Sequence, residues 1–265
     1  MISKILIAIN KLEDVETYRK AGITAFLFPL EGFVVGYNEI SLEDILKVDV
    51  SNKFLLVNRI LTSDDIDRLK DILKELKGIK GIVFEDVGVY YLIKELNLDL
   101  ELLLFQNHFG SNSRSVKYWL GNVDSVFLCN ELTYNELEDI CTNNHDLTVH
   151  LFGYNQVMYS RRLLLSNWSE NFNLVYKSNN LIEDTATHIR FRAVENNYGT
   201  VMYSDKVFNG RRLVNLPNVK YFYINTMMID SERIISFIND LDINTELEDE
   251  GFLDKPTIYK IGRNK

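Results

Sequence analysis

Acids and amides follow a series of short apolar segments along the chain, and these polar residues are the best suited to chemistry. They are Asn10, Glu31, Asn58, Glu85, Asp86, Gln106, Asn107, Asn130, Glu131, Asn155, Gln156 and Asn225. A carboxylate of this set can act as a general acid or base where burial or crowding raises its pKa. It can equally bind a divalent cation through oxygen, and the spacing of the acids leaves both roles open.

Histidines and short motifs add little to this set. His108 follows Gln106 and Asn107 and belongs with them, whereas His150 lies inside an apolar segment and is expected in the core. The chain has no GxGxxG after an apolar segment, no GxxxxGKS/T, no HExxH and no GxSxG motif. Nucleotide-dependent enzymes, HExxH metallopeptidases and α/β-hydrolases therefore lack their usual signatures here.

The apolar segments predict parallel strands, because amphipathic segments of helical period separate them. The segments are residues 5–9, 25–30, 54–57, 82–84, 102–105, 126–129, 147–152 and 221–224. About eight such strands close into a (β/α)8 TIM-like barrel, an α/β fold. All strand ends of a barrel meet at one face, so the acids and amides are expected around one mouth.

Helix signals support this alternation. Thr133 and Glu136 have the spacing of a capping box, and Ser63 with two following aspartates opens a second helix. That second helix carries one apolar stripe, which ends near Gly78, and a last helix is expected to begin near Asp230.

One barrel domain is expected over residues 1–265, with an inserted irregular and β-rich segment at about residues 154–218, before the last strand. Residues 154–168 have no clear period, whereas residues 189–194 and 200–203 fit a small hairpin. Insertions that follow a barrel strand commonly cover the mouth. Residues 257–261 are apolar enough to add a closing strand.

Composition restricts the partners and the location. A net charge of −9 argues against broad binding to nucleic acid or anionic membrane, although Arg161 and Arg162 could form a local basic patch. The 2 cysteines and the lack of a CxxC pair argue against a disulfide framework or a four-thiolate metal site. No stretch has the length of a signal peptide or membrane span, so a cytoplasmic protein without membrane contact is expected.

Several blocks together resemble the collagenase-like peptidases, the unassigned-type peptidase family 32. The blocks read AGITA from Ala21, GIVFEDVG from Gly81, LLLFQNHFGSN, LCNELTYNELEDI and LTVHLFGYNQVMYSRRLLLS, with weaker similarity in ENNYGTVMYS and GFLDKPTIYKI. Their order matches the family, and they cover most of the chain. The resemblance implies a barrel and, for some relatives, hydroxylation of RNA bases or of a quinone precursor with an iron–sulfur cluster and in some cases prephenate.

The resemblance points to Glu131 and adds Tyr159, Ser160 and Arg162 to the candidates taken from the strand ends, and the chain departs from the family at the cluster positions. Relatives with a cluster have cysteines at the positions of Gln156 and Leu163, and neither side chain can bind iron as a thiolate does. The cluster is therefore predicted to be absent, and no cofactor or metal is expected, although a prephenate-like or other small anion could bind. The predicted catalytic residues are Glu131, Glu85 and Tyr159, and the predicted substrate-binding residues are Asn58, Gln106, Asn107, Ser160 and Arg162.

Three functions remain open from the sequence. The resemblance favours a role in hydroxylation of tRNA or other RNA bases, either as an enzyme or as the partner without a cluster in a hetero-oligomer with a longer family member. That longer partner would bring the tRNA contact. The alternatives are a peptidase or other hydrolase that uses the mouth carboxylates, and a non-catalytic barrel that binds a small ligand through Arg162 and the amides.

Overall fold

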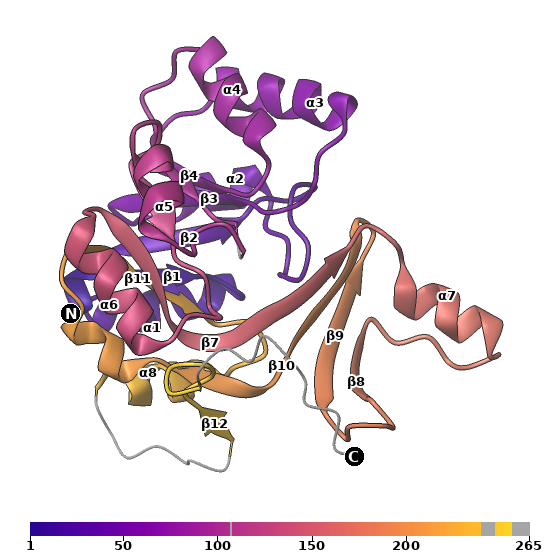
Figure 1. Ribbon diagram of the computed structural model, residues 1–265. Coiled ribbons are helices and arrows are strands. Elements are labelled where there is room, and N and C mark those ends of the chain that lie inside the picture. Colours follow the sequence, from indigo (N-terminus) through magenta and orange to yellow (C-terminus); the bar gives the residue numbers. More distant parts are fainter. Residues whose placement is uncertain (107, 240–246, 256–265) are drawn as a thin grey trace.

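A closed barrel of eight parallel strands forms the body of the computed structural model, which describes residues 1–106, 108–239 and 247–255 (Figure 1). The strands are β1 (Ile5–Ala8), β2 (Ala25–Pro29), β3 (Asn52–Val57), β4 (Gly81–Phe84), β5 (Glu101–Leu104), β6 (Ser125–Phe127), β7 (Leu147–Ser160) and β11 (Val219–Asn225). Each strand pairs with the next along the chain, β11 pairs with β1, and the β11–β7 pairing closes the ring. The predicted TIM-like barrel is confirmed.

Helices connect the strands and cover the outside of the barrel. They are α1 (Val15–Lys20), α2 (Leu42–Lys47), α3 (Ser63–Lys74), α4 (Val87–Glu95), α5 (Ser113–Leu120), α6 (Tyr134–Asn143) and α8 (Ser231–Ile238), with short 3-10 turns η1 (Ile2–Lys4), η2 (Leu12–Asp14) and η3 (Arg211–Asn215). Both barrel faces of the strands are buried, which explains why they appear in the sequence as continuous apolar segments.

Side chains fill the barrel interior, so the barrel is a packed core and not a pore. The aromatic rings of Phe105, Phe127 and Tyr223 contact one another there, with ring centroids 4.6–6.0 Å apart. A second apolar layer lies between the strands and the helices, and both cysteines, Cys129 and Cys141, belong to it.

Local capping sets the helix starts that the sequence predicts. The Thr133 hydroxyl accepts the Glu136 N–H while the Glu136 carboxylate accepts the Thr133 N–H, which forms the expected capping box of α6. Helix α3 has the same arrangement between Thr62 and Asp65, so its N-cap lies one residue before the predicted start at Ser63. Asp230 is the N-cap residue of α8, as expected.

The seventh barrel strand continues far beyond the barrel. Strand β7 pairs with β11 as far as Phe152 and then with antiparallel β10 (Gly199–Asn209) as far as Ser160. Gly153 lies at the change of partner with φ +127, and any side chain there would collide with the Asn225 carbonyl oxygen. Residues 154–160, which show no period in the sequence, are therefore strand because β10 pairs with them.

Strands β8 (Asn179–Glu183) and β9 (Arg190–Asn196) extend this antiparallel sheet, and helix α7 (Leu164–Asn171) precedes them. The predicted hairpin at residues 189–203 is confirmed by the β9–β10 pairing. We call residues 164–196 the arm, because α7, β8 and β9 project away from the barrel (Figure 1). A two-residue strand, β12 (Glu248–Asp249), pairs with β10.

A buried carboxylate fixes the start of α7 to the arm sheet. Glu195 on β9 accepts the N–H groups of Leu165 at 2.7 Å and Ser166 at 3.0 Å, together with the Thr200 hydroxyl. The predicted closing strand at residues 257–261 lies outside the described residues. Within the described part of the chain, no helix has the length and apolar character needed to cross a membrane.

Candidate functional site

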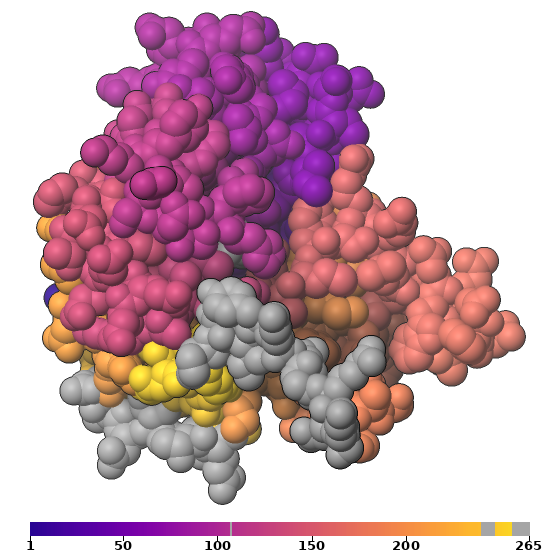
Figure 2. All heavy atoms as spheres, in the orientation of Figure 1, coloured from indigo at the N-terminus to yellow at the C-terminus, as the bar shows by residue number. Residues whose placement is uncertain are grey.

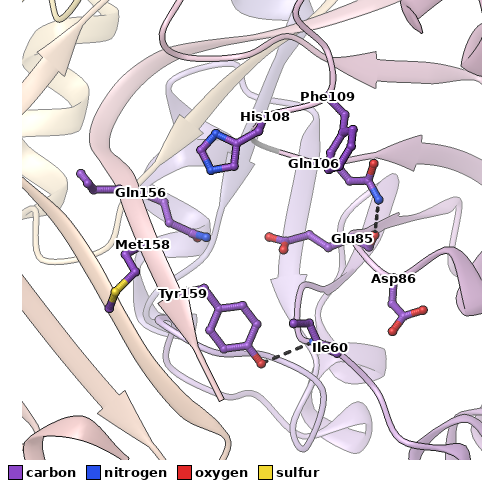
Figure 3. Close-up of a pocket in the computed structure, with 10 residues that line it drawn as sticks. Ile60, Glu85, Asp86, Gln106, His108, Phe109, Gln156, Met158 and Tyr159 are labelled. Carbon is purple, nitrogen blue, oxygen red and sulfur yellow. Dashed lines mark hydrogen bonds between the residues drawn. The ribbon is translucent and has the colours of Figure 1, made fainter. Parts of the chain in front are cut away.

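A pocket of about 280 Å³ opens at the C-terminal ends of three adjacent barrel strands, where the extension of β7 forms its other wall (Figure 3). Its lining residues follow β3, β4 and β5 or lie on β7. They are Ile60, Glu85, Asp86, Gln106, His108, Phe109, Gln156, Val157, Met158 and Tyr159. The mouth expected from the sequence is therefore present, but it is built from one side of the barrel and the strand extension.

Glu85 is the central ionisable residue of this pocket. Its carboxyl group points into the space that Gln156 and His108 face (Figure 3), and its Oε1 atom is buried with no hydrogen-bond partner among the described residues. Burial raises the pKa of Glu85 well above its ordinary value. The site therefore favours the neutral acid, which can donate a hydrogen bond to a ligand.

The two glutamines differ in their availability. The Gln106 Nε2 atom donates to the Glu85 backbone carbonyl at 2.9 Å and so fixes the β5 end against the β4 end (Figure 3). The Gln156 Oε1 atom is buried without a hydrogen-bond partner among the described residues. Buried polar atoms are usually hydrogen-bonded in folded proteins, so the two that face this pocket are available to bind a polar ligand or water.

Tyr159 closes the pocket beside β3. Its hydroxyl accepts the Ile60 N–H at 3.4 Å (Figure 3). Burial raises the pKa of Tyr159, while the Ile60 N–H and the charges of Arg59 and Arg161 oppose this rise. The phenol is therefore neutral and positioned as a wall with one polar atom.

Asp86 is not a second free carboxylate, although it lines the pocket. Its Oδ1 atom accepts the Gly88 N–H at 2.8 Å, which caps α4, and its Oδ2 atom accepts the Leu61 N–H at 3.0 Å. Both oxygens thus hold loops in place. Glu85 is the carboxyl group of the pocket with an oxygen left for a ligand.

The predicted site residues divide into those that share the pocket and those that do not. Glu85, Gln106 and Tyr159 lie together in it. Asn58 is fully buried, and its amide donates to the Val35 carbonyl at 3.1 Å and accepts the Val35 N–H at 3.0 Å, so it holds the β2–α2 loop. Asn107 lies outside the described residues.

Three more predicted residues lie away from the lining. The Glu131 side chain is exposed, and its backbone N–H contacts the Cys129 sulfur. Ser160 accepts the Arg162 N–H at 3.1 Å, and the Arg162 side chain is exposed. The apolar lining residues Ile60, Phe109, Val157 and Met158 were not predicted, because nothing in the sequence signals the β7 extension that brings these walls together.

A polar cluster of tyrosines and His150 lies in the core near the pocket. The Tyr37 and Tyr223 hydroxyls are 2.7 Å apart, and the Tyr203 hydroxyl donates to the Gly36 carbonyl. Burial lowers the pKa of His150 to about 4. The Asn155 Oδ1 atom lies 2.8 Å from Nδ1 and the Phe152 carbonyl oxygen lies 3.0 Å from Nε2, and the neutral ring has one N–H to donate to these two acceptors. His150 is thus the core histidine that the sequence predicts.

The cysteines lie away from the pocket. Cys129 and Cys141 are both reduced and buried in the layer between strands and helices, and burial raises the pKa of both thiols. Gln156 lines the pocket and Leu163 precedes α7, and these are the two positions at which the resemblance implies cysteines in cluster-bearing relatives. The residues present therefore do not fit a thiolate-bound iron–sulfur cluster. Within residues 1–106, 108–239 and 247–255, no three His, Cys, Asp or Glu side chains form a metal-binding group.

Comparison with known proteins gives one family. The sequence model of peptidase family U32 matches residues 43–203, which include all lining residues of the pocket. No curated protein matches. Among solved structures, the U32 peptidase Mk0906 is 16% identical with a TM-score of 0.46, over 57% of this chain and 69% of that one. A chitinase from Chromobacterium violaceum is 11% identical with a TM-score of 0.43, over 89% and 98%.

Proposed function

The chain belongs to peptidase family U32, and from this premise we propose that its barrel mouth holds an RNA base during base hydroxylation, as the partner without a cluster. The observation that carries the proposal is that the Glu85 acid and the Gln156 amide line one pocket, each with a buried oxygen that has no hydrogen-bond partner among the described residues. A nucleobase edge combines donors and acceptors in one plane, and such unpaired groups are suited to reading it.

The size and walls of the pocket support a base as the ligand. About 280 Å³ accommodates a single heterocycle, and the rings of Phe109 and Tyr159 offer surfaces for stacking. Arg161 and Arg162 lie two and three residues after Tyr159 and are exposed, so they can contact the adjoining phosphates. A small anion such as prephenate has no lysine or arginine among the lining residues and would depend on these two exposed side chains.

The redox step is assigned to a second protein. Hydroxylation of a base needs an oxidant and a centre for electron transfer, and neither cysteine of this chain is near the pocket. The role left to this chain is to bind and orient the base. The Glu85 acid would donate a hydrogen bond to the base edge, and the Gln156 amide oxygen would accept one from it. A longer, cluster-bearing member of the family is the expected partner.

Mass spectrometry of tRNA and rRNA nucleosides from cells with and without the gene tests this proposal. A hydroxylated pyrimidine is expected to disappear in the deletion strain and to return with the wild-type chain or with Glu131→Gln, which changes an exposed acid outside the pocket. Glu85→Leu is expected not to restore it. Unchanged nucleosides in the deletion strain, with no family member recovered by pull-down from native cells, would refute the proposal.

Hydrolysis is the second candidate, and the raised pKa of Glu85 favours it. A buried acid that keeps its proton can protonate a leaving group. Asp86 is held by backbone N–H groups, so a mechanism with two free carboxylates lacks its second member. Cleavage of peptide substrates by the purified chain, lost in Glu85→Gln, together with unchanged nucleosides in the deletion strain, would establish hydrolysis in place of base binding.

A further inference from the structure

The outer edge of the arm sheet is open for pairing. Strand β8 pairs with β9 over five residues without a bulge, and no other described strand pairs with it. The Glu195 N–H donates to the Ser178 carbonyl, so the backbone groups of alternate residues from Ser178 onward face β9. The intervening residues Asn179, Leu181 and Glu183 therefore present their N–H and C=O groups outward.

This edge lacks the basic residues, prolines and bulges that commonly prevent pairing. Strand β8 reads Asn-Asn-Leu-Ile-Glu and contains no proline, lysine or arginine. Natural sheets commonly protect an edge with these residues, or with a bulge, to prevent association. An exposed and regular edge is a template for another strand.

Exposed apolar side chains gather on the same arm. Seven of the eighteen exposed large hydrophobic residues of the described chain lie between residues 168 and 189, and Val175 is 86% exposed. They are Trp168, Phe172, Leu174, Val175, Tyr176, Leu181 and Ile189. The arm stands out from the molecular surface (Figure 2). Such a concentration of apolar surface on a projecting element indicates an interface.

The charges at the two ends of β8 match each other. Exposed Lys177 lies three residues before Asn180, and exposed Glu183 lies three residues after it. Lys177 lies before β8, across a bend at Ser178. In an antiparallel pair of two β8 strands centred on Asn180, each Lys177 therefore lies at the end of the pair that holds the other copy's Glu183. The same register pairs Asn179 with Leu181, and the outward backbone groups of both meet.

We propose that a second copy of this chain pairs with β8 across a two-fold axis at Asn180, with the apolar side chains of the arm flanking the axis. A two-fold interface requires one surface patch to complement itself, and the charge order about Asn180 meets this requirement. The proposal goes beyond the proposed function and does not depend on it, because the arm edge contributes no residue to the pocket lining.

Sedimentation of the full chain at several concentrations tests the dimer, and charge reversal tests the register. Lys177→Glu or Glu183→Lys brings like charges together at both ends of the paired strands, and each is expected to weaken the dimer about tenfold. The double variant K177E/E183K restores opposite charges and is expected to return the dissociation constant to about the wild-type value. Circular dichroism and thermal unfolding of each variant check that the fold is kept.

Cysteine cross-linking provides an independent test. Two opposed residues of a non-hydrogen-bonded antiparallel pair have Cα atoms about 4.5 Å apart, within the range for a disulfide. Asn180→Cys is therefore expected to form a covalent dimer on mild oxidation, whereas the matched control Asn179→Cys, which lies opposite Leu181, is expected not to. The wild-type chain, with its two buried thiols, sets the background.

Three results would overturn the proposal. They are a chain that stays monomeric at every concentration, a dimer that neither charge reversal weakens, and equal cross-linking by the Asn179 and Asn180 variants. The first excludes the dimer, and the other two exclude β8 or this register as its basis.

Discussion

Replacing Glu85 by glutamine tests the buried carboxyl group directly. Glutamine has nearly the shape of the protonated acid but carries no proton that can be lost in this pH range. Below about pH 4.3, the ordinary pKa of a glutamate in an unfolded chain, wild type and variant are therefore expected to be about equally stable. Above that pH they are expected to diverge.

The divergence follows from the raised pKa of Glu85 in the folded protein. Between the unfolded-state pKa and the folded-state pKa, the folded chain holds a proton that the unfolded chain has released. The free energy of unfolding of the wild type then falls by about 1.4 kcal/mol for each pH unit, relative to the variant. The stabilising contribution is complete below the unfolded-state pKa and is lost as the pH rises through the folded-state pKa.

Urea denaturation of both proteins between about pH 4.5 and about pH 8 measures this slope. Other titrating groups cancel in the difference between the two proteins, and Glu131→Gln measures the effect of removing one exposed negative charge. A difference that stays constant with pH would refute the argument. So would a variant that becomes less stable than the wild type as the pH rises.

Three further predictions concern the residues that hold the mouth and the core in place. Asn58→Ala removes both hydrogen bonds to Val35 and is expected to lower the free energy of unfolding by about 2–4 kcal/mol in urea denaturation; an unchanged midpoint would contradict this. Asp65→Asn leaves buried Arg59 without its carboxylate and is expected to cost about 3–5 kcal/mol. Burial opposes ionisation of Asp65, but hydrogen bonds from Thr62 and the two nearby arginine charges outweigh burial and lower the pKa of Asp65. The loss of stability in Asp65→Asn is therefore expected in full above about pH 3.9 and is expected to disappear as the pH falls through the lowered pKa. For His150, an NMR titration of the ring is expected to have its midpoint near pH 4. Because the unfolded chain binds this proton near pH 6.5, the residue makes the protein less stable as the pH falls from about 6.5 towards 4. A midpoint near 6.5 would show that burial does not hold the ring neutral.

The sequence by itself determined the barrel. Each barrel strand is buried on both faces and therefore appears as an uninterrupted apolar segment, and the predicted segments coincide with the strands to within a few residues. The helix starts at Thr133 and Asp230 depend on contacts within a few residues, so they too could be predicted locally. The places of Glu85 and Gln106 at the mouth followed from the strand ends alone.

Only the tertiary structure decided which of these polar residues share a pocket. Glu85 and Gln106 come together because β4 and β5 are neighbours and the Gln106 side chain donates to the Glu85 backbone carbonyl. Asn58 follows β3 in the same way, yet both of its side-chain amide atoms form hydrogen bonds with Val35 of the β2–α2 loop. Glu131 follows β6 and lies in solvent.

The extension of β7 and the arm were equally hidden from the sequence. Residues 154–160 become strand through pairing with β10, whose paired residues lie 40 to 53 positions further along the chain, and this pairing brings Gln156 and Tyr159 against the β3 and β4 ends. Hydrophobic burial leaves a local pattern that the sequence displays. Pairing between distant segments, and the direction in which a side chain points after its strand ends, depend on the whole chain and leave no such pattern.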